Sequence, residues 1–118
     1  MIILDSIQEA LKAFDLPVYY GRTFADEKDK WNYIVFNRTN FSKSGRSNCD
    51  YNHYYQVHII FEEYIPEGFE INIIKAMEKI GLRLENVPHT YNYTTKNNTD
   101  IVIEMLTITF TKSRRCNA

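Results

Sequence analysis

The stretch Tyr55-Gln56-Val57-His58-Ile59-Ile60-Phe61 has the clearest pattern in the chain. Its odd-numbered positions hold aromatic or aliphatic side chains, whereas Gln56 and His58 are polar. Because successive side chains of a β-strand point to opposite faces of a sheet, this alternation predicts a strand with one apolar face. The fold should therefore contain a sheet that other elements cover on that face.

Two segments with helical periodicity can supply the cover. A first helix is predicted near the N-terminus, where Ser6 and Glu9 fit a capping box and Pro17 would end the helix. A second predicted helix ends at Gly81, because glycine is favoured just past a helix C-terminus. The apolar side chains expected to face the sheet are Ile7, Ala10, Leu11, Phe14, Phe69, Ile73, Met77 and Ile80.

Segments rich in β-branched and aromatic residues predict the other strands, at 18–20, 31–38, 82–94 and 100–112. Pro88 should kink the third of these or keep it at a sheet edge. The apolar pattern of the last strand changes phase, which either a β-bulge near 104–106 or apolar cover on both faces would explain. We therefore predict one α+β domain over residues 1–118, with a mostly antiparallel twisted sheet of four to five strands and two helices packed on one face.

Two polar segments, 22–30 and 39–52, are predicted to be loops. Loops as long as the second often have a function or are disordered. Long strands with few prolines can also pair between subunits, and head-to-tail contacts of that kind build rings. The candidate residues for contacts with other subunits are Lys43, Arg46, Asn48, Asp26, Lys28 and Lys30.

The composition argues against several classes of protein. The 118 residues include 14 basic and 15 acidic side chains, so the chain lacks the basic excess of a duplex-DNA binder. No run approaches the ~20 apolar residues that span a bilayer, and the apolar start is too short for a signal peptide. We therefore expect a cytoplasmic protein without a membrane partner, in which the thiols of Cys49 and Cys116 are reduced.

No pattern in the sequence indicates catalysis. Cys49, His53 and His58 lack the paired spacing of a structural zinc site, and no nucleophile elbow, phosphate-binding loop or zinc-protease motif occurs. Glu62 and Glu63 are adjacent, so on a strand they would point to opposite faces of a solvated strand end. We predict no catalytic residue, no metal and no cofactor, and hence no enzyme.

Sheet-based binding of single-stranded nucleic acid is an alternative. Tyr54, Tyr55, Tyr91 and Tyr93 could form a platform on which bases stack. Basic residues are not interleaved with these tyrosines, and cross-strand packing would explain them equally well. We expect no sequence-specific binding of nucleic acid.

Five segments carry a resemblance to a known family: "SIQEALKAFDLPVYYG" (6–21), "WNYIVFN" (31–37), "YYQVHIIFEEY" (54–64), "KAMEKIGLRLENV" (75–87) and "IVIEMLTITFTKS" (101–113). In this order they resemble the small tail-completion or tail-terminator proteins of long-tailed bacteriophages and prophages. The resemblance covers nearly the whole chain, although its motifs are patterns and no single residue is diagnostic.

The resemblance implies a structural protein that caps the tail tube as a hexameric ring and allows the head to attach. The implied partners are copies of the chain itself, the major tail tube protein and a head–tail connector. The implied location is the virion tail, after assembly in the bacterial cytoplasm. Another neck, head-completion or minor capsid protein of the same phage module is the closest alternative.

Overall fold

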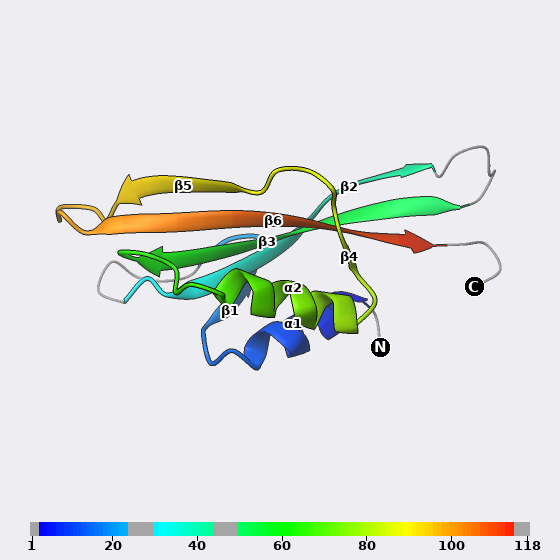
Figure 1. Ribbon diagram of the computed structural model, residues 1–118, viewed down its shortest axis with the longest axis horizontal. Helices are drawn as coiled ribbons and strands as arrows, with labels where there is room; N and C mark the ends of the chain where they lie inside the picture. Colours follow the sequence, from blue (N-terminus) through cyan, green and yellow to red (C-terminus); the bar gives the residue numbers. More distant parts are fainter. Residues whose placement is uncertain (1–2, 24–29, 44–49, 115–118) are drawn as a thin grey trace.

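The computed structural model describes residues 3–23, 30–43 and 50–114 and contains a six-stranded, mostly antiparallel sheet with two helices on one face (Figure 1). The strand order is β1-β2-β3-β6-β4, and β5 pairs with β6 further along the edge that β4 occupies. Only β1 and β2 are parallel. The elements are α1 (Ile3–Lys12), β1 (Val18–Tyr20), β2 (Tyr33–Lys43), β3 (Tyr51–Glu62), α2 (Phe69–Lys79), β4 (Arg83–Leu84), β5 (Thr90–Thr95) and β6 (Val102–Arg114).

The predicted α+β class is confirmed, with slightly more strands than expected. The arm that contains Pro88 forms two short strands, β4 and β5, on either side of the proline. His89 bridges part of this interruption, because its Nδ1 accepts a hydrogen bond from the Thr109 N–H at 3.3 Å and its Nε2 contacts the Glu85 carbonyl at 3.2 Å. Proline at this edge position therefore divides the strand without opening the sheet.

The pairing of β3 with β6 is continuous. All 12 residues of β3 pair with β6, from Tyr51 opposite Arg114 to Glu62 opposite Ile103, in a single register. The predicted β-bulge near 104–106 is therefore wrong. The alternative explanation is correct, because apolar side chains cover both faces of the first half of β6.

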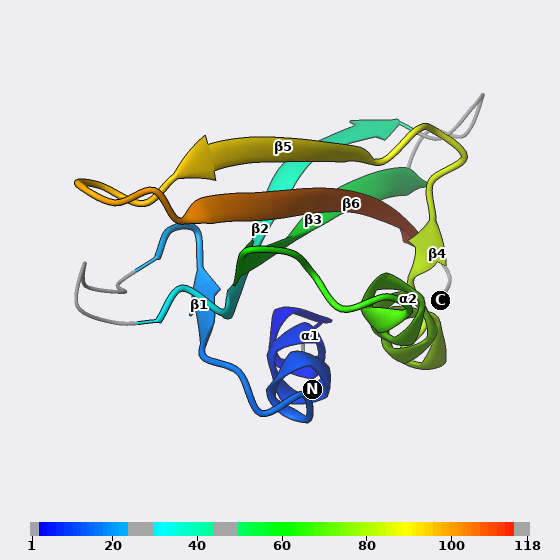
Figure 2. The same ribbon diagram turned by 60° about the vertical axis from the view of Figure 1, so that its left-hand side comes forward.

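The main core lies between the sheet and the helices (Figure 2). The predicted helical stripes are confirmed at their centres, where Ile7, Leu11, Ile73 and Met77 are fully buried. Each such side chain contributes roughly 1.5–3 kcal/mol by leaving water. The strand residues packed against them are Ile34, Phe36, Tyr55, Val57, Ile59, Leu106, Ile108 and Phe110.

A second, smaller cluster lies on the opposite face of the sheet. Its buried members are Tyr33, Val35, Ile60 and Ile103. Tyr19, Trp31 and Met105 pack around them and are partly buried. This cluster explains why Ile103 and Leu106 of one strand are both buried although they point to opposite faces.

The ends of the two helices differ in how well the sequence predicts them. α1 begins at Ile3, so Ser6 lies inside the helix and the predicted capping box is wrong. The helix starts earlier because Ile3 and Leu4 also pack against the main core.

At the end of α2, the Leu82 N–H donates to the Met77 carbonyl and the Gly81 N–H to the Glu78 carbonyl, both at 3.0 Å. This is a Schellman motif, as the glycine predicted.

The predicted loop at 39–52 is wrong at both of its ends. β2 continues to Lys43 and β3 begins at Tyr51, with a register shift in β2 between Arg38 and Asn40. The polar side chains of this stretch do not prevent strand formation, because the strands are held by backbone hydrogen bonds and their side chains can face solvent. Residues 44–49 lie outside the described part of the chain.

The strands are much longer than the helices that cover them. α1 and α2 have 10 and 11 residues, which corresponds to about 15 Å each, whereas β3 and β6 have 12 and 13 residues and reach about 40 Å. Both ends of the sheet therefore run past the helices (Figure 1). Neither described helix is long and apolar enough to cross a membrane.

The Schellman motif gives a test of this description. Gly81 has a φ of 97°, a conformation that side chains with a Cβ rarely adopt, and an added Cβ would lie 3.1 Å from Lys112 Nζ. We expect Gly81→Ala to lower the free energy of unfolding by about 1 kcal/mol in a urea titration. The substitution Lys79→Ala, at an exposed position two residues earlier, should change it by less than about 0.5 kcal/mol. Equal effects of the two substitutions would contradict the assigned helix end.

Candidate functional site

One end of the sheet forms an extension that we call the distal arm, made of residues 38–43 of β2, 51–54 of β3 and 111–113 of β6. Burial changes abruptly along β2. Tyr33–Phe36 are buried, and every residue from Arg38 to Lys43 is exposed. This change occurs where β1 ends, so the outer side of β2 has no neighbouring strand along the arm within the described residues.

The helix-side face of the distal arm holds aromatic rings that are not part of the core. The Phe41 side chain is 66% exposed. Its ring stacks on the imidazole of His53 with centroids 5.6 Å apart and meets the Tyr51 ring edge-on at 6.0 Å. Such a pairing orients the rings and leaves most of the Phe41 surface in water, where it is accessible to a partner.

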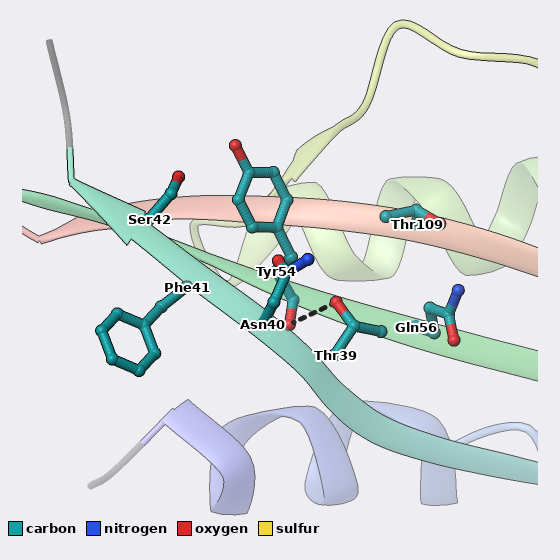
Figure 3. A pocket seen from close by; sticks show the side chains of 7 residues that line it. All are labelled: Thr39, Asn40, Phe41, Ser42, Tyr54, Gln56 and Thr109. Carbon is teal, nitrogen blue, oxygen red and sulfur yellow. Dashed lines mark hydrogen bonds between the residues drawn. The ribbon is translucent and has the colours of Figure 1, made fainter.

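The opposite face of the distal arm is polar and slightly hollow. Figure 3 shows Tyr54 and Ser42 on the side of β2 away from Phe41. The Thr39 hydroxyl donates to the Tyr54 carbonyl at 3.4 Å, which fixes the strand next to its register shift. The hollow has a volume of about 500 Å³ and is lined by Thr39, Asn40, Phe41, Ser42, Tyr54, Gln56 and Thr109. Its shape is open, so it resembles a contact surface more than a small-molecule site.

At the other end of the sheet, β5 forms an exposed edge with tyrosines on its helix side. All six residues of β5 are exposed, and the described part of the chain has no strand on its outer side. Tyr93 is 62% exposed and Tyr64, on the neighbouring loop, is 67% exposed. Together with Tyr91 they line a hollow that also contains Glu67, Glu70 and Glu104. We call this group the tyrosine edge.

Glu104 organises the tyrosine edge. One of its carboxylate oxygens accepts a hydrogen bond from the Tyr93 hydroxyl at 2.8 Å, and the other accepts one from the Ile65 N–H at 2.8 Å. The hydrogen bond to Glu104 raises the pKa of Tyr93. Burial raises the pKa of Tyr91, and the charges of Glu70 and Glu104 add to the shift. The carboxylates that contribute to these shifts place negative charge at this surface.

An ion pair closes the smaller apolar cluster. Lys96 is only 8% exposed, and its Nζ donates to Glu62 Oε1 at 2.7 Å. The same oxygen accepts a hydrogen bond from the backbone N–H of Trp31 at 3.0 Å. Lys96 Nζ also lies 5.5 Å from the centroid of the Trp31 ring. The hydrogen bond from Lys96 lowers the pKa of Glu62. Glu62 is therefore not the solvated strand end that the sequence suggested, whereas Glu63 is exposed.

His58 connects the three central strands on the face opposite the helices. Its Nε2 lies 2.7 Å from Asn37 Oδ1 on β2, and its Nδ1 lies 2.9 Å from Thr107 Oγ1 on β6. The Asn37 oxygen can only accept, so Nε2 carries the proton and Nδ1 accepts from the hydroxyl. Burial lowers the pKa of His58. The imidazole is therefore neutral, and both of its nitrogens are held in hydrogen bonds that link the strands.

The structure separates the candidate contact residues that it describes. Lys43 ends β2 in the distal arm and is exposed. Lys30 is also exposed but precedes the other end of β2, roughly 35 Å away along the strand. The two lysines therefore do not form one surface. Asp26, Lys28, Arg46 and Asn48 lie outside the described residues.

The alternative sites considered from the sequence do not assemble. Tyr55 is buried against the helices and Tyr54 points to the opposite face, so they cannot form one stacking platform with Tyr91 and Tyr93. His53 and His58 likewise lie on opposite faces, and Cys49 is outside the described residues. Within the described ranges, no three His, Cys, Asp or Glu side chains are grouped as metal ligands.

Comparison with known protein families and with curated proteins gives no match for this sequence. The structure shows an α+β sheet protein in which β5 and the distal arm of β2 have no strand on their outer sides among the described residues.

The Glu62–Lys96 pair generates a stability prediction. Replacing Lys96 with Met leaves the Glu62 charge in a half-buried site without its cationic partner, so we expect the free energy of unfolding to fall by about 2 kcal/mol. The matched substitution Lys79→Met, at an exposed position of α2, should cost less than about 0.5 kcal/mol. A urea titration of both variants measures this, and similar costs for the two would contradict the structural role of Lys96.

The environment of His58 predicts a pH dependence. The folded state holds the imidazole at a lowered pKa, so near and below pH 6.5 the unfolded chain binds more protons than the folded one. Stability should be full above that pH and should decrease as the pH falls towards the folded-state pKa. Urea titrations at about pH 7.5 and about pH 5.5 should show a smaller loss for His58→Gln than for the natural chain. An equal loss in both proteins would contradict the buried neutral imidazole.

Proposed function

We propose that the protein is a structural subunit of a bacteriophage tail, a terminator or completion protein that caps the tail tube as a ring and allows the head to attach. The observation that supports this proposal is that, among the described residues, no strand pairs with the outer side of β2 along the distal arm or with the outer side of β5. These edges belong to different strands, so a contact between them is head-to-tail. Contacts of that type generate closed rings when the rotation closes.

The proposal also rests on the resemblance of the five sequence segments to tail-terminator proteins. Its partners are further copies of the chain, arranged as a hexameric ring, the major tail tube protein and a head–tail connector. The exposed rings of Phe41, Tyr64 and Tyr93 suit such a role, because large aromatic side chains are enriched at protein interfaces. The buried polar groups described above have structural partners, which leaves the exposed surfaces to carry the function.

Electron microscopy of tails made without the protein tests the function. If the protein stops tube growth, tails from phage that lack its gene should contain tubes longer than normal and variable in length. Supplying the protein from a plasmid should restore the normal length.

Tubes of normal, fixed length in the absence of the protein would refute termination. If such tubes occurred together with full heads that fail to join them, the neighbouring function of a neck or head-completion protein would be supported instead.

A further inference from the structure

The backbone of β5 has hydrogen-bonding groups on its outer side, where no described strand pairs with it. The Lys96 N–H donates to the Ile101 carbonyl in the β5–β6 register, so this residue directs its backbone groups towards β6. Along a strand of an antiparallel pair, residues alternately direct their backbone N–H and C=O groups towards the partner strand and away from it. Asn92 and Thr94 therefore also face β6, whereas Tyr91 and Tyr93 present their N–H and C=O groups outwards.

The outer side of β2 offers a complementary set in the distal arm. The Ile34 N–H donates to the Pro17 carbonyl, and the Phe36 carbonyl accepts the Gly21 N–H, so this half of β2 is occupied by β1 and the residue after it. The Glu63 N–H donates to the Val102 carbonyl of β6, so the odd-numbered residues of β3 direct their backbone groups towards β6 and the even-numbered ones towards β2. Beyond the register shift, Asn52 and Tyr54 of β3 lie opposite Ser42 and Asn40, which therefore direct their backbone groups towards β3. The residues that alternate with them, Phe41 and Lys43, direct their backbone groups outwards.

The two open edges match in direction and in face. β5 is antiparallel to β6, β6 to β3, and β3 to β2, so β5 and β2 run in opposite directions across the sheet. The side chains of Tyr91 and Tyr93 share the helix-side face with Leu106, and Phe41 shares it with His53. When a second copy is placed beside the first with its helices on the same side, its β2 is antiparallel to β5.

The charges of the two edges are also complementary. The tyrosine edge carries Glu70 and Glu104, and Glu67 lines the same hollow. The exposed part of β2 carries Arg38 and Lys43 and no acidic residue. β5 itself has the sequence TYNYTT, without the lysine, proline or other charge that usually blocks an edge strand from pairing. A second copy of the chain therefore offers what β5 lacks: a strand with a free edge and a positive charge.

We propose that β5 of one copy pairs with the distal arm of β2 in the next copy, with Tyr93 opposite Phe41 and Tyr91 opposite Lys43. This contact rests on the proposed ring-forming function, because it takes a second copy as the partner. It joins the sheets of neighbouring copies, stacks Phe41 against Tyr93, and brings Lys43 to the negative surface beside Glu70. The register also places Asn92 opposite Ser42 as a non-hydrogen-bonded pair on the other face.

Disulfide trapping tests the register. In a chain with Cys49→Ser and Cys116→Ser, one sample carries Asn92→Cys and a second, mass-tagged sample carries Ser42→Cys. Non-hydrogen-bonded positions are about 4.5 Å apart between Cα atoms, within the range for a disulfide. At millimolar protein we expect a mixed dimer that forms about tenfold faster than a mixture of Asn92→Cys with Asn40→Cys, which is shifted by two residues. Absence of this preference, or dimers formed by Asn92→Cys alone, would overturn the proposed pairing.

Exchanging the charges at Lys43 and Glu70 tests whether these two side chains meet in the contact. Lys43→Glu should weaken self-association in analytical ultracentrifugation by up to about fivefold, and adding Glu70→Lys should restore it. Lys75→Glu, on the exposed side of α2, is the matched control and should have no effect. If the double variant associates as weakly as Lys43→Glu, the assigned partner of Lys43 is wrong.

The outcomes separate this inference from the proposed function. If the mixed disulfide forms but tubes keep their normal length without the protein, the contact stands and the terminator function fails. If tube length depends on the protein but Asn92→Cys and Ser42→Cys show no preference for each other, the function stands and the contact fails.

Discussion

The ladder between β3 and β6 is the constraint on which the rest of the structure depends. Every residue of β3 has a partner on β6 in one register, and the side-chain alternation of both strands is therefore fixed along their whole length. One face receives Val57, Ile59, Leu106 and Ile108, which require the helices as cover. The other face receives Ile60 and Ile103, which require the smaller cluster and its closing ion pair. A shift of one residue in the pairing register would move the side chains of one strand to the opposite face of the sheet.

The length of this ladder also explains the exposed ends. Two helices of 10 and 11 residues can cover less than half of strands with 12 and 13 residues. The uncovered parts hold exposed rings and two strand edges without a neighbour in the described chain. Open edges are a liability in a protein that functions alone and an asset in a subunit that assembles. The proposed assembly therefore uses edges that the mismatch in length leaves open, and no constellation of reactive groups enters the proposal.

Much of the fold was predictable from the sequence, because the apolar positions of 55–61 and of both helices have clear periods. The errors have physical causes. Ser6 looked like a helix cap, but the helix begins at Ile3, and Ile3 and Leu4 pack against the core. The exposed end of β2 looked like a loop, because a solvated strand and a loop have similar compositions. Glu62 and Lys96 are 34 residues apart, so only the folded chain shows that they pair. Of the two candidate contact residues that the structure describes, Lys43 takes part in the proposed contact and Lys30 does not.

Amide hydrogen exchange in the dilute protein, followed residue by residue by NMR, tests the central ladder and its open edges most directly. We expect slow exchange throughout the paired segments of β3 and β6. On β5 the amides of Asn92 and Thr94 should exchange slowly, and those of Tyr91 and Tyr93 should exchange rapidly, because the latter pair point away from β6. Slow exchange at Tyr91 and Tyr93, or rapid exchange within the β3–β6 ladder, would contradict the account.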